Sequence, residues 1–153
     1  MERRVSPIIR DLLEERRLVR ARLGKKAVEE EQRGAEYDLE KARKSLEEGD
    51  FKWATVKSYY SMFHAARALL YKAGYREKSH RALVSALREL YTSPGMLKEE
   101  ALSDFENVMD LREEADYALK FSENGARRSV RDAERFLVTA RVILRSRLGK
   151  IRD

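Results

Sequence analysis

The spacing of hydrophobic side chains along this 153-residue chain is helical almost throughout. Apolar residues recur at intervals of three and four, and no segment of useful length alternates apolar and polar residues as a strand does. The chain has two prolines, Pro7 and Pro94, and glycines at positions 49, 74, 95 and 125 fall where we expect helices to stop. The pattern predicts an all-α fold.

About five helices and an extra N-terminal helix follow from this pattern. Ser6-Pro7 is a typical helix start, and we expect the first helix to run as far as Leu23, with a kink or break at Gly24 or Gly34. Asp50 and Ser79 can cap later helices. The five further helices cover roughly residues 35–48, 50–73, 79–90, 101–119 and 126–144. Their seams and short connections predict an up-and-down antiparallel bundle over residues 35–153, preceded by a basic helical extension at residues 1–34.

Charge is distributed unevenly along the chain. Residues 1–26 hold nine Arg and Lys against four acidic residues, residues 27–124 hold fifteen against twenty, and residues 125–153 hold nine against three. Two basic ends that flank an acidic middle permit an anionic partner such as nucleic acid, although charge-rich helices also carry such residues on solvated faces.

Composition excludes several classes of site. The chain has no cysteine, two histidines and no run of 18 apolar residues, so we expect no disulfide, metal site, cofactor or membrane association. It starts without an apolar signal region, and we expect a cytoplasmic protein. Three Asn and Gln residues in total, among many Lys, Arg and Glu, are typical of a thermophilic source. Nucleotide-binding glycine loops, the HExxH motif and the serine nucleophile motif are all absent.

Arg112 breaks the hydrophobic pattern. It stands in the seam of Phe105, Val108 and Ala115, where Leu or Val is expected, so it needs a partner or a groove. Asp116 lies one turn later on the same side and can accept from it. Two interpretations remain open: an ion pair that fixes packing, or an arginine that contacts an anion in a cleft between helices.

Two further groups are candidate binding residues. Tyr60, His64, Arg67 and Tyr71 share one helix face, which suits stacking and hydrogen bonding to bases or phosphate and equally suits a polar helix–helix or dimer interface. Lys78 and His80 flank a helix start, which is either an anion site or an ordinary cap.

Four segments together resemble the HEPN-domain family, in its small single-domain subgroup of uncharacterised proteins. They occur in the family's order and spacing and cover roughly Glu36 to Leu148: the helix around SYYSMFHAARALL (58–70), KSH (78–80), LREEADY (111–117) and AERFL (133–137). The resemblance implies an up-and-down helical bundle, usually a homodimer. It also implies a minimal nucleotidyltransferase as the partner in a toxin–antitoxin-like pair.

Several members of this family are metal-independent ribonucleases that use an Arg-x(4–6)-His motif across the dimer. Arg112 matches the arginine, but no histidine follows it, and Asp116-Tyr117 stands where the histidine would be. His64 is a substitute if the helices meet there. Tyr117 matches, by analogy, a tyrosine that nucleotidyltransferases modify in some pairs.

These observations support three hypotheses. The first is a binding module for a nucleotide or RNA, in which Arg112, Asp116 and Tyr117 face Tyr60, His64 and Arg67 near the dimer axis. The second is an endoribonuclease with a degenerate motif, using Arg112 with His64 or Tyr117. The third is a structural dimerisation domain whose Arg112–Asp116 pair fixes packing.

Overall fold

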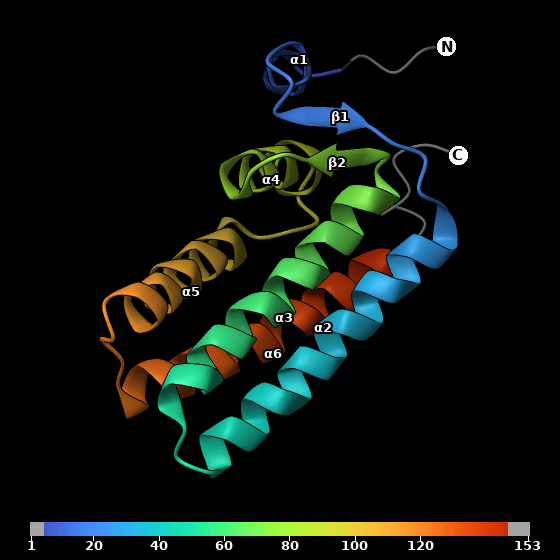
Figure 1. Cartoon of the computed structure of the whole chain (residues 1–153). Coiled ribbons are helices and arrows are strands. Elements are labelled where there is room, and N and C mark those ends of the chain that lie inside the picture. Colours follow the sequence, from blue (N-terminus) through green and yellow to red (C-terminus); the bar gives the residue numbers. More distant parts are fainter. Residues whose placement is uncertain (1–4, 147–153) are drawn as a thin grey trace.

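Three long helices form the body of the molecule (Figure 1). The computed structural model describes residues 5–146, and within them α2 (Gly24–Glu47) and α3 (Phe51–Lys72) pack side by side while α6 (Glu123–Arg145) packs against both. α5 (Glu99–Tyr117) packs on α3 and α6. The predicted all-α fold is confirmed, with α2 to α6 as the five helices and α1 (Pro7–Glu14) as the extra N-terminal helix.

The helix starts follow the capping residues read from the sequence. The side chains of Ser6, Asp50 and Ser79 each accept a backbone N–H three residues on, at 3.1, 3.3 and 3.1 Å. Asp50 therefore starts α3, and Ser79 starts the short α4 (His80–Leu87), which continues into the π-helical turn η1 (Arg88–Thr92). The stop expected at Gly125 is wrong, because the hydroxyl of Ser122 accepts from the Gly125 N–H at 3.0 Å and starts α6 earlier.

A small antiparallel sheet is the part of the fold that the pattern does not predict. β1 (Leu18–Arg20) pairs with β2 (Tyr75–Glu77), with Leu18 opposite Glu77 and Arg20 opposite Tyr75. Three-residue strands are too short to show an alternating pattern. The sheet fixes the N-terminal segment to the turn between α3 and α4.

The expected first helix is therefore too long. α1 ends at Glu14, and Arg16 adopts a left-handed backbone with φ of 58° before the chain enters β1. α2 begins at Gly24 and continues through Gly34, where a Cβ would come within 3.3 Å of the His64 ring. The expected boundary between residues 34 and 35 thus falls inside α2. Residues 1–4 and 147–153, at the two ends of the expected domains, lie outside the described residues.

α3 is the central helix. Thirteen of its side chains are buried, on faces directed toward α2, α5 and α6, because each of these helices packs on it. Its small residues allow this close packing, since Ala54, Ala66 and Ala68 are fully buried. The ring of Phe105 from α5 stacks on Tyr59 at 5.8 Å, and the buried Tyr91 hydroxyl donates to the Leu69 carbonyl at 2.6 Å. Within residues 5–146 no helix is long and apolar enough to cross a membrane.

Candidate ligand site at Arg112

Arg112 lies near the end of α5, on the side that packs against α3. The seam residues on either side of it, Val108 and Ala115, are buried, so the helix carries the guanidinium into a packed region. The side chain of Arg112 is 15% exposed. A cation at this depth is tolerated only with compensating partners.

Three tyrosine rings surround this guanidinium. Its Cζ lies 5.4, 5.3 and 5.6 Å from the ring centroids of Tyr59, Tyr60 and Tyr117, within the range of cation–π attraction. Tyr59 and Tyr60 come from α3, and Tyr117 is the last residue of α5. We call Arg112 and these three tyrosines the arginine cage.

The polar partners of Arg112 are few. Its Nη2 donates to the Tyr60 hydroxyl at 2.7 Å and lies 3.5 Å from the Asp116 carboxylate. Its Nε is buried and has no hydrogen-bond partner among the described residues. Burial would lower the pKa of Arg112, but Tyr60, Tyr117 and Asp116 raise it above its ordinary value. The guanidinium is therefore firmly charged and has more donors than the protein supplies acceptors.

Tyr59 of the arginine cage is paired with a histidine, His80. The Tyr59 hydroxyl and His80 Nδ1 are 3.1 Å apart, and the His80 ring packs 4.7 Å from Phe105. Burial lowers the pKa of His80 to about 4, opposed by the nearby Asp110, and burial raises the pKa of Tyr59 to about 12 although Arg112 acts in the opposite direction. Both groups are neutral at pH 7. His80 Nε2 is buried and has no hydrogen-bond partner among the described residues, while Nδ1 faces Tyr59, so His80 supports Tyr59.

We expected Tyr60, His64 and Arg67 to lie together opposite Arg112. In the structure only Tyr60 of these three contacts Arg112. Tyr60 reaches Arg112, whereas His64 turns toward α2, with its Nδ1 2.6 Å from Glu31 and its Nε2 3.5 Å from Asp38. Arg67 joins the same carboxylate of Glu31 at 3.5 Å and lies 3.3 Å from Glu77 of β2.

The remaining candidate residues lie apart from the cage. Lys78 has an exposed side chain, and its backbone N–H donates to the Arg17 carbonyl at 2.9 Å next to the small sheet. Tyr71 hydrogen-bonds with Arg67, and its ring lies 5.1 Å from that guanidinium. Among residues 5–146, no group of three or more His, Asp or Glu side chains is arranged to hold a metal ion.

The turn between α5 and α6 exposes three large apolar side chains, of which Leu119 and Phe121 were not expected to be exposed. Tyr117, Leu119 and Phe121 are 76%, 68% and 51% exposed, and Leu119 has a left-handed φ of 53°. The hydrophobic period of α5 treats Leu119 as its last seam residue. The helix ends before it, at Tyr117, so Leu119 points away from the core.

Two comparisons with known proteins relate the whole bundle to one family. The family model described as HEPN domain matches residues 28–150, which include α3 to α6 and all of α2 except its first four residues. A protein of Archaeoglobus fulgidus described as a UPF0332 protein is 34% identical over 111 residues, covering 71% of this chain and 88% of that protein.

Proposed function

Because the chain belongs to the HEPN-domain family, we propose that it is a nucleotide- or RNA-associated binding module in which Arg112 contacts a phosphate of the ligand. The observation that carries this proposal is a half-buried guanidinium that has, among the described residues, a single carboxylate, at 3.5 Å, as its anionic partner. Phosphate oxygens are strong acceptors for such a group and complete its hydrogen bonding.

The tyrosines of the arginine cage give the ligand a second kind of contact. Tyr60 and Tyr117 are 36% and 76% exposed, so each presents part of a ring to solvent beside the charge. Bases stack on such rings at about 1–3 kcal/mol each. We assign no ligand contact to His64 or Arg67, since carboxylates of α2 and β2 already occupy them.

Replacement of Arg112 tests this function. We expect Arg112→Ala to weaken binding of a labelled single-stranded RNA, measured by anisotropy, or of AMP, measured by calorimetry, by about tenfold or more, since a charge-assisted hydrogen bond is lost. Arg127→Ala is the matched control, because Arg127 is exposed and paired with Glu123 at 2.8 Å. Equal affinities in the wild type and Arg112→Ala would refute the proposal. If stability alone falls, Arg112 and Asp116 only fix packing.

The ribonuclease hypothesis is tested with the same variants. No described histidine contacts Arg112: His64 lies against α2 and the free nitrogen of His80 is buried. A general acid or base must reach the reacting atoms, and of the two partners in this hypothesis, His64 and Tyr117, only Tyr117 lies beside Arg112. We expect no cleavage of a structured RNA in EDTA. Cleavage that disappears in Arg112→Ala would instead establish an endoribonuclease.

We also propose a homodimer that pairs with a minimal nucleotidyltransferase. Exposed apolar side chains mark interaction sites, and Tyr117, Leu119 and Phe121 supply them next to the arginine cage. Light scattering after size exclusion should give a dimer for the wild type and a monomer for Leu119→Glu with Phe121→Glu. Val142→Glu, at an exposed position on α6, is the control. Co-purification with the product of a neighbouring nucleotidyltransferase gene tests the partner.

A further inference from the structure

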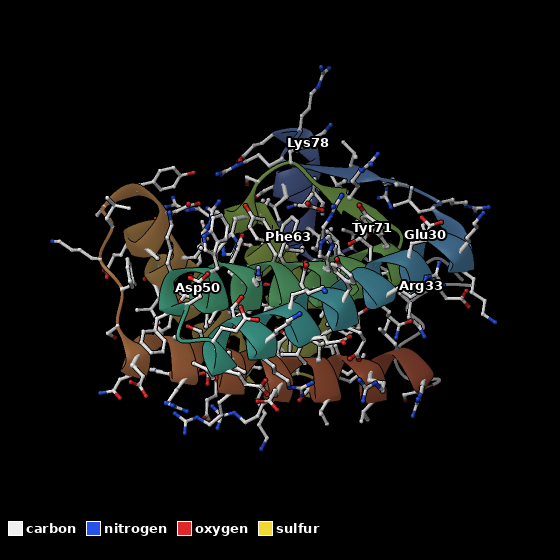
Figure 2. All side chains as sticks on the ribbon, turned by 60° about the horizontal axis from the view of Figure 1, so that its bottom comes forward. Glu30, Arg33, Asp50, Phe63, Tyr71 and Lys78 are labelled. Carbon is white, nitrogen blue, oxygen red and sulfur yellow. The ribbon has the colours of Figure 1, made fainter. Side chains whose placement is uncertain are left out.

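A pocket of about 870 Å³ opens at the end of the bundle where α2 begins and α3 ends. Figure 1 places this end on the right, away from the turn between α5 and α6 on the left, and in Figure 2 Tyr71 and Glu30 lie toward it while Asp50 lies at the far end. Its walls are the last residue of β1 and the turn after it, the first turns of α2, the end of α3, Tyr75 and Leu144. It shares no residue with the arginine cage.

Positive charge dominates the walls of this pocket. Four cationic side chains line it against one carboxylate, that of Glu29; the four are Arg20, Arg22, Lys25 and Lys72. Lys25 lies 4.0 Å from Glu29, and Lys72 donates to the Leu144 carbonyl, whereas among residues 5–146 no lining carboxylate pairs with Arg20 or Arg22. Within residues 5–146, Arg22 has no ion-pair partner, and its side chain is exposed at the rim. This excess of charge attracts an anion into the pocket.

The pocket is preformed by backbone contacts. The Ala21 N–H donates to the Gly74 carbonyl at 2.9 Å, and the pairing of Arg20 with Tyr75 fixes the strand beside it. Gly24 turns the chain into α2 with a φ of 80°, and nothing lies within 4 Å of the place where its Cβ would be. The turn therefore borders open space rather than packed side chains.

Aromatic rings form part of the lining. Tyr71 and Tyr75 are 7% and 6% exposed, and the Arg20 guanidinium lies 5.8 Å from the centre of the Tyr75 ring. Pockets of 300–1,000 Å³ with apolar walls and a few directed polar groups are typical small-molecule sites. Cations next to tyrosine rings suit a ligand that combines phosphate with a planar group.

We propose that this pocket binds a small molecule carrying a phosphate group, with Arg22 and Lys25 as its main anion contacts. Three of the four cations precede residue 28, where the HEPN match begins, so the pocket combines the N-terminal segment with the family bundle. The site is independent of Arg112 and of the proposed function.

Backbone NMR of the full-length chain carrying Arg112→Ala tests the pocket without interference from the arginine cage. Pyrophosphate, AMP and adenosine are titrated separately. We expect saturable shifts of the amides at residues 22–25 and 74–75 with pyrophosphate or AMP, and much weaker binding of adenosine. Adenosine binding as tight as that of AMP would overturn the proposal, and so would the absence of a saturable shift with both phosphate probes.

A pair of double variants separates a defined site from diffuse attraction. Arg22→Gln with Lys25→Gln should weaken binding of the phosphate probe by about tenfold or more, because hydrogen bonds to a charged group are lost. Arg33→Gln with Lys44→Gln removes the same charge from exposed positions elsewhere on α2 and should leave the affinity unchanged. Equal weakening in both pairs would overturn the proposal. A short RNA that shifts these amides while both phosphate probes fail would also overturn it.

Discussion

Arg67 and Arg112 both reach into packed regions of this bundle, but their partners differ. Arg67 of α3 lies 3.5 Å from Glu31 and 3.3 Å from Glu77, and His64 joins the same Glu31 carboxylate from the next turn. Arg112 of α5 has Asp116 at 3.5 Å and otherwise three tyrosine rings. Both side chains are about equally buried, at 21% and 15% exposed.

The two arginines differ in how much of their positive charge remains available to a ligand. Arg67 of α3 contacts a carboxylate of α2 and one of β2, and among the described residues Glu77 would be unpaired without it, so the charge of Arg67 is used within the fold. Arg112 meets one carboxylate and aromatic faces that are partly open to solvent, so its charge is not balanced internally. Whether an arginine in a packed region keeps capacity to bind a ligand therefore depends on how many carboxylates it contacts, and not on its burial alone.

The largest expected effect is on stability at Arg67. Arg67→Ala leaves the Glu77 carboxylate without its cation and Glu31 with only His64, and should reduce the free energy of unfolding by about 3 kcal/mol. Arg112→Ala should reduce it by about 1 kcal/mol, since Tyr60 and Asp116 can turn toward water. Urea denaturation monitored by circular dichroism measures both values. Equal losses would remove the distinction between the two arginines.

A smaller effect is expected on the pH dependence of stability, through His80, the partner of Tyr59. The pKa of His80 is lowered from 6.5 to about 4, so the unfolded chain takes up a proton near pH 6.5 while the folded chain resists until about pH 4. Stability due to His80 is therefore complete above pH 6.5 and is lost as the pH falls through this window. Thermal melts at pH 7 and pH 4.5 should show a larger decrease for the wild type than for His80→Asn. Identical decreases would mean that His80 is not buried as described.

The smallest expected effect is on stability at Gly34, and it tests how rigidly Glu31 and Asp38 hold the His64 ring. Gly34→Ala gains about 1 kcal/mol of helix propensity, but its Cβ would press on His64 at 3.3 Å, a ring held by Glu31 and Asp38. We expect a net loss of about 0.5 kcal/mol in the wild type and a gain in a His64→Ala background, measured by denaturation. A gain in both backgrounds would show that His64 yields easily.

The sequence predicted the bundle well, because helix caps and seams are local signals. Ser6, Asp50 and Ser79 start helices as expected, and the family resemblance agrees with the HEPN match over residues 28–150. The strand at Leu18–Arg20 escaped detection, since it exists through pairing with residues far along the chain. Apolar spacing at Val19 and Leu23 continued the pattern of α1 although Arg16 turns the backbone away.

The candidate site was predicted in part. Arg112 stood out because a charge replaced an expected apolar residue, and Tyr60, Asp116 and Tyr117 lie beside it. Helical spacing places Tyr60, His64 and Arg67 on one face, but the neighbour of that face changes along α3 from α5 to α2 and β2. His80 was missed as the support of Tyr59, since no local pattern reports a contact between residues 21 positions apart.

The pairing of β1 with β2 has a consequence for the order of folding. Leu18 meets Glu77 across the full length of α2 and α3, whereas those two helices are joined by a short turn. Closing the long loop costs more entropy than closing the helical hairpin, so the hairpin forms first and the strand docks on it afterwards. We therefore expect the pocket beside this strand to be assembled late in folding, after the hairpin of α2 and α3.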